Sequence, residues 1–128
     1  MRWAQEVISD FGKSIGIQNL SIGNDKNLIL NLSEDSTIKI SLLEDAPVPE
    51  IIVSRFIISN YLPTDILKKL LEMSHFELNA EGILQCAADE KRIVVASRIP
   101  ERNFNIAILK SSLSMLDAKE IELYYNKF

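Results

Sequence analysis

Three consecutive residues near the N-terminus, Gly12, Lys13 and Ser14, are of the types that close a phosphate-binding loop in many nucleotide-binding proteins. The complete motif needs a second glycine five residues before the first, so that the backbone amides can fold around the phosphates. Val7 occupies that position. The motif also follows a strand, whereas here the preceding apolar residues recur every four positions, as in an amphipathic helix. We therefore predict no nucleotide site, and interpret the glycine and lysine as residues that end a helix.

The other side chains capable of nucleophilic or metal chemistry are few. The sequence has one cysteine, Cys86, and one histidine, His75, too few for a tetrahedral zinc site without suitably spaced carboxylates. A Cys86 nucleophile with His75 as its base is conceivable. A cysteine in the apolar stretch ILQCAA is more typical of a small buried residue, however, and His75 of a solvated helix end. We expect no catalytic residue, no metal and no cofactor.

Acidic residues gather in two predicted turns. Paired carboxylates perform acid–base catalysis when a cleft raises the pKa of one of them, but in exposed turns they mainly keep a protein soluble. We favour the second role for these residues, which are Glu44, Asp45, Glu50, Asp89 and Glu90.

Length and composition predict one globular domain over residues 1–128, with 47% hydrophobic and 25% charged residues. A net charge of −4 argues against a nucleic-acid partner, because such binding depends on cations that neutralise phosphates. The N-terminal residues lack the apolar core of a signal peptide, and no apolar run approaches the roughly eighteen residues of a membrane span. With its single cysteine, the chain is expected to be cytoplasmic, with no membrane partner.

The hydrophobic periodicity predicts an α+β fold, a twisted antiparallel sheet with three helices in the order α-β-β-β-α-β-β-α. Alternation is clearest at residues 37–42, where Ile38, Ile40 and Leu42 share one side. The loop containing Pro47 and Pro49 leaves the start of the third strand uncertain. Strands are expected at residues 28–32, 37–42, 51–58, 83–88 and 92–99, and helices at about 3–12, 61–76 and from about 103 onward.

Several short strings, in this order and in an acidic chain of this length, resemble one known family. They are Phe11-Gly12 with Ile15-Gly16-Ile17, Leu20-Ser21-Ile22, Gly23-Asn24-Asp25, Leu70-Leu71-Glu72-Met73 and Gly82-Ile83-Leu84. Together with the long terminal helix they span almost the whole chain, which resembles the small acidic chaperones of type III secretion systems, the Tir-chaperone-like (class I) family. The resemblance implies a homodimer of α+β subunits that binds the N-terminal segment of a bacterial effector and consumes no nucleotide.

The resemblance also implies two sets of contact residues. Effector contacts in apolar grooves near the first helix and the sheet would involve Val7, Phe11, Leu30, Ile38, Ile40 and Val53. The dimer contact, on the second helix and the strand after it, would involve Ile66, Leu67, Leu70, Leu71, Met73, Ile83 and Leu84.

Physical reasoning favours a binding protein independently of the resemblance. A thin helix–sheet sandwich with this many apolar residues has more apolar surface than one core consumes, and the surplus favours a dimer or a partner groove. An extended partner could also add hydrogen bonds at a sheet edge. Two alternatives stay open: a non-catalytic adaptor or regulatory module that binds a folded protein, and a small hydrolase that uses Cys86.

Overall fold

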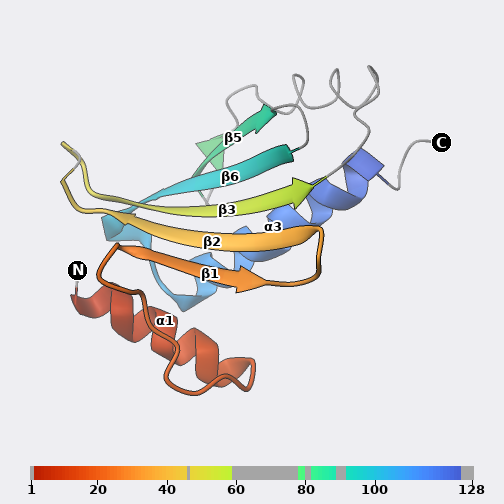
Figure 1. Ribbon diagram of the computed structural model, residues 1–128. Coiled ribbons are helices and arrows are strands. Elements are labelled where there is room, and N and C mark those ends of the chain that lie inside the picture. The colour runs from red at the N-terminus through yellow and green to blue at the C-terminus, as the bar shows by residue number, and fades with distance from the viewer. Residues whose placement is uncertain (1, 46, 59–77, 80–81, 89–91, 125–128) are drawn as a thin grey trace.

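The computed structural model describes residues 2–45, 47–58, 78–79, 82–88 and 92–124 (Figure 1). Within these ranges it contains two α-helices, a short 3-10 helix and six strands. In chain order these are α1 (Arg2–Ser14), β1 (Asn27–Asn31), β2 (Ser36–Leu43), β3 (Glu50–Ile58), β4 (Leu78–Asn79), β5 (Gly82–Ala88), β6 (Arg92–Pro100), η1 (Glu101–Asn103) and α3 (Ile106–Tyr124).

The six strands form one antiparallel sheet in the order β1-β2-β3-β6-β5-β4. The register brings Ile40 of β2 opposite Val53 of β3, which in turn lies opposite Ser97 of β6. All three side chains are fully buried. The alternation of buried and half-buried residues along β2 and β6 shows that one face of the sheet is covered.

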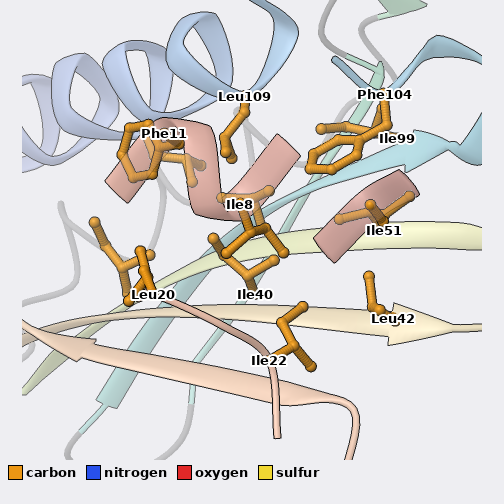
Figure 2. Close-up of a cluster of buried hydrophobic side chains, with 14 of the residues drawn as sticks. Ile8, Phe11, Leu20, Ile22, Ile40, Leu42, Ile51, Ile99, Phe104 and Leu109 are labelled. Atoms are coloured by element: carbon orange, nitrogen blue, oxygen red, sulfur yellow. The ribbon is translucent and has the colours of Figure 1, made fainter. Parts of the chain in front are cut away.

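Both α-helices cover that same face, as Figure 1 shows for α3 behind the central strands. Ile8 and Phe11 of α1 and Leu109 of α3 join Ile40 of β2 and Ile99 of β6 in one apolar core (Figure 2). The covered face also carries one charge, because Arg55 of β3 lies opposite Ile38 and Val95 in the register.

The Arg55 side chain is only 11% exposed, and its charge is compensated within the fold. Its guanidinium is 3.2 Å from Asp117 Oδ1 of α3 and donates to Ser36 Oγ of β2. This ion pair and hydrogen bond therefore tie α3 to the centre of the sheet.

The α+β class and the antiparallel sheet predicted from the sequence are confirmed, and the five expected strands begin and end within one residue of their predicted positions. The second expected helix, at residues 61–76, lies outside the described residues. The terminal helix begins at Ile106, later than expected, because Glu101–Asn103 form η1 and Asn105 Oδ1 accepts the Ile108 N–H to cap α3. Strand β4 was not expected, since two residues are too few to show periodicity.

The sequence Gly12-Lys13-Ser14-Ile15-Gly16 forms the C-terminal end of α1. The Ile17 N–H donates to Gly12 O at 2.8 Å and the Gly16 N–H to Lys13 O at 3.2 Å, the pair of bonds that defines a Schellman motif. Gly16 has a φ of 85°, the left-handed conformation that this motif requires and that glycine adopts without strain. The predicted helix end is therefore confirmed, two residues later than Gly12.

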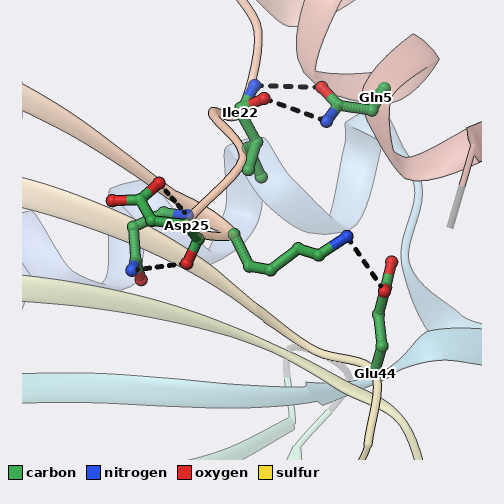
Figure 3. A network of polar contacts seen from close by, with 6 residues as sticks. Gln5, Ile22, Asp25 and Glu44 are labelled. Atoms are coloured by element: carbon green, nitrogen blue, oxygen red, sulfur yellow. Dashed lines mark hydrogen bonds and ion pairs between the residues drawn. The ribbon is translucent and has the colours of Figure 1, made fainter.

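The side chain of Gln5 holds the segment between α1 and β1 at Ile22. The Gln5 amide donates to Ile22 O at 3.1 Å and accepts the Ile22 N–H at 2.9 Å, so it pairs with Ile22 as a neighbouring strand would (Figure 3). Leu20 and Ile22 are buried on either side of exposed Ser21. Beyond them, Lys26 Nζ lies 3.2 Å from Glu44 Oε2, which ties the start of β1 to the end of β2.

Candidate partner-binding surface

The residues expected to contact an effector lie mostly inside the folded chain. Ile40 and Val53 are 0% exposed, and Phe11 and Ile38 are nearly so, because the sheet face that carries them is the one covered by the helices. Val7 and Leu30 are half-buried and pack against the same core. In the folded chain Phe11, Ile38, Ile40 and Val53 therefore belong to the core, and of the six expected residues Val7 and Leu30 keep surface that a partner can contact.

The residues expected at the dimer contact fall into two groups. Ile66, Leu67, Leu70, Leu71 and Met73 lie outside the described residues. Ile83 and Leu84 lie on β5, next to the β4 edge of the sheet. The strand order separates this edge from β1 by the whole width of the sheet.

The opposite edge of the sheet is strand β1, and no described strand pairs with its outer side. At the two ends of the β1–β2 ladder, Leu42 N–H donates to Lys26 O and Leu32 N–H to Ser36 O, each at 2.9 Å. Since hydrogen-bonded and non-bonded pairs alternate in an antiparallel ladder, even-numbered residues of β1 bond to β2 and odd-numbered residues point away. The backbone N–H and C=O of Ile29 and Asn31 are therefore directed outward.

The outward backbone groups at the start of β1 are hydrogen-bonded to the preceding turn, whereas those further along the strand have no described partner. Asn27 N–H donates to Asp25 Oδ1, and Asn27 O accepts a long bond of 3.4 Å from Gly23 N–H. Among the described residues, no hydrogen-bond partner is found for the outward backbone groups of Ile29 and Asn31. The open stretch thus offers two donors and two acceptors to a strand from another chain.

Apolar side chains accompany this open stretch. Ile29 is 58% exposed on the side of the sheet away from the helices, and Leu32, just beyond the strand, is 50% exposed. An exposed edge strand with large apolar side chains is what soluble proteins usually avoid, because it templates pairing with another chain. Sequence reasoning missed Ile29, although its exposure follows from its position out of phase with Leu28 and Leu30.

The metal site and the Cys86–His75 pair considered from the sequence gain no support from the described residues. Within them, no three or more side chains of histidine, cysteine, aspartate or glutamate come close enough to hold a metal ion. Cys86 lies on β5, whereas His75 lies outside the described residues, so their pairing is not tested. Within the described part of the chain, neither helix is both long and apolar enough to cross a membrane.

Comparison with known proteins gives matches by structure and none by sequence. No protein-family model and no curated protein matches the chain. A chain of the crystal structure of the ExsC–ExsE complex has a TM-score of 0.76 and 15% identity, over 92% of this chain and 88% of its own length. A chain of the Yersinia pestis type III secretion chaperone SycH, in complex with a stable fragment of YscM2, has a TM-score of 0.72 and 15% identity, over 94% and 98%.

A third structure, the HopA1–SchA chaperone–effector complex, aligns with a TM-score of 0.66 and 18% identity, over 89% of this chain and 87% of the matched one. Such low identities transfer no residue roles. Coverage of nearly the full length of each chain nevertheless establishes the architecture, and this protein has the fold found in complexes of type III secretion chaperones.

Proposed function

We propose that the protein is a type III secretion chaperone, which binds the N-terminal region of a cognate effector and keeps it soluble and competent for secretion without nucleotide hydrolysis. The observation that carries this proposal is the open edge of β1, at Ile29 and Asn31, in a fold shared with chaperones that were solved together with effectors.

The edge geometry suggests how an effector segment is held. An extended segment laid beside β1 exchanges main-chain hydrogen bonds with Ile29 and Asn31, which requires no particular effector sequence. Its alternate side chains then fall on the two faces of the sheet, and those on the open face lie next to exposed Ile29. Main-chain pairing holds the segment extended, which is the state a secretion channel needs.

We also propose that two copies of the chain associate through the residues expected from the sequence, on the segment before β4 and on β5. The strand order supports separate surfaces for the dimer contact and the effector contact, because β5 and β1 lie at opposite sides of the sheet. In such a homodimer the two open β1 edges face outward, and each remains accessible to an effector.

The Ile29→Pro variant tests the proposed edge directly. Proline removes the outward N–H of residue 29 but no bond of the β1–β2 ladder, and edge strands tolerate it. Tagged wild-type and variant proteins are purified from the native host, and bound polypeptides are identified by mass spectrometry. We expect the wild type to retain one or a few polypeptides, and Ile29→Pro to lose them.

The matched control is Ile29→Thr, which keeps the N–H and a β-branched side chain and should retain most of the partner. Limited proteolysis of the complex then distinguishes the two classes of binding protein. A protected N-terminal segment without compact structure agrees with a chaperone, whereas a protected folded domain would indicate an adaptor. A partner that binds wild type and Ile29→Pro equally well would contradict the proposed edge.

A further inference from the structure

The face of the sheet away from the helices contains a hollow of about 300 Å³. It lies where β1 and β3 end and where β2 and β6 begin. Its apolar part consists of Ile29, Phe56 and Ile58, and the last of these is 46% exposed. The described residues that line it are Ile29, Thr37, Lys39, Phe56, Ile58 and Arg92.

The charge of this lining differs from that of the protein. The chain has a net charge of −4, yet the described residues that line the hollow include two cations, Lys39 and Arg92, and no carboxylate. Arg92 also takes part in other interactions, so Lys39 is the cation that a ligand's carboxylate would meet. The Arg92 guanidinium lies over the Phe56 ring, 5.6 Å from its centroid, so the apolar floor and the positive charge are adjacent. A ligand that suits the hollow therefore combines an apolar group with a negative charge.

Ile29 connects the hollow to the open edge, because its backbone faces outward from β1 while its side chain lines the hollow. A strand added to β1 lies about 4.8 Å outside it and directs every second side chain to the open face, beside Ile29. The Lys39 side chain, on the next strand inward and directly opposite Ile29 in the register, is within reach of a carboxylate on that added strand.

We propose that the hollow selects among partner segments, by accepting an aliphatic side chain that has an aspartate or glutamate two residues away on the same face of the added strand. This inference rests on the proposed function and specifies the chemistry of its ligand. A second copy of the chain fits the hollow less well, since a symmetric contact centred there would place Lys39 and Arg92 against their own copies.

Two synthetic peptides test the selection. Both have about twelve residues of an extended, β-prone sequence and carry a fluorescent label, and they differ only in glutamate or lysine at the position two residues after the central leucine, on the same face of the strand. Binding to the full-length protein is measured by fluorescence anisotropy at low and high salt. We expect the glutamate peptide to bind about three- to tenfold more tightly at low salt, with the difference shrinking at high salt.

Charge-reversal variants make the test specific to the hollow. Lys39→Glu should reverse the preference between the two peptides, and Lys39→Gln should abolish it. The control Lys110→Glu makes the same change of net charge on an exposed position of α3, which packs on the opposite face, and should preserve the preference. The fluorescence spectrum of the single tryptophan checks that each variant is folded.

The outcomes separate this inference from the function on which it rests. If both peptides bind equally and Ile29→Pro weakens both, the edge is used and the proposed selection is wrong. Equal affinity of Lys39→Glu for the two peptides, or a preference lost in Lys110→Glu, also overturns the selection. If neither peptide binds, or if Ile29→Pro binds both as the wild type does, the proposed edge fails together with the selection.

Discussion

Gly12 shows how one hydrogen atom in place of a methyl group sets the position of a helix. A Cβ added there would lie 2.6 Å from Leu20 Cβ and 2.8 Å from Ile17 O, both closer than real contacts allow. Gly12→Ala must therefore separate α1 from the segment that returns toward β1. We expect it to lower the free energy of unfolding by about 1–3 kcal/mol, measured by urea denaturation.

Lys13→Ala is the matched control, since Lys13 is exposed one position further along α1. We expect a change within about 0.5 kcal/mol and unaltered partner binding. Loss of function in Lys13→Ala through lost nucleotide binding would instead revive the phosphate-loop interpretation of this sequence. Equal stability of Gly12→Ala and the wild type would show that α1 can move away from Leu20 at no cost.

At the scale of an element, Gln5 replaces the strand partner that residues 20–22 lack. Gln5→Ala leaves the partly buried N–H and C=O of Ile22 without their partner, which costs about 1–3 kcal/mol. Thermal unfolding followed by circular dichroism measures this loss. Glu6→Ala, a change at an exposed neighbour on α1, should unfold near the wild-type temperature, and a similar midpoint for Gln5→Ala would mean that water satisfies Ile22.

Elements and their contacts differ in how far they can be predicted. Period-two alternation is local, so strand limits such as those around Ile38, Ile40 and Leu42 follow from the sequence. The same alternation cannot distinguish a core from a groove, because Ile40 and Val53 are apolar in either case and their burial depends on where α1 and α3 pack. The outward-facing backbone groups of Ile29 could not be predicted from the sequence either. They depend on which strand lies at the edge of the sheet, and on which residues of that strand are hydrogen-bonded to its neighbour.

At the scale of the whole molecule, self-association and partner binding should be separable. We expect a dimer at micromolar concentration by sedimentation velocity, and a shift toward monomer for Leu70→Glu, a residue of the proposed dimer contact. Ile29→Pro should sediment as the wild type does, because β1 lies across the sheet from β5. A strict monomer for the wild type would count heavily against the proposed chaperone, and dissociation by Ile29→Pro would place β1 within the dimer contact.

Trp3 of α1 is packed against residues that lie at least 98 positions further along the chain. Its ring centroid lies 5.9 Å from that of Phe104, and its indole N–H donates to Glu101 at 3.1 Å. During synthesis α1 cannot acquire these contacts until residues beyond 104 have left the ribosome, so Trp3 docks only after all the described strands have been made. The docking of α1 is thus a late, long-range step of folding, and the emission of the single tryptophan follows that step.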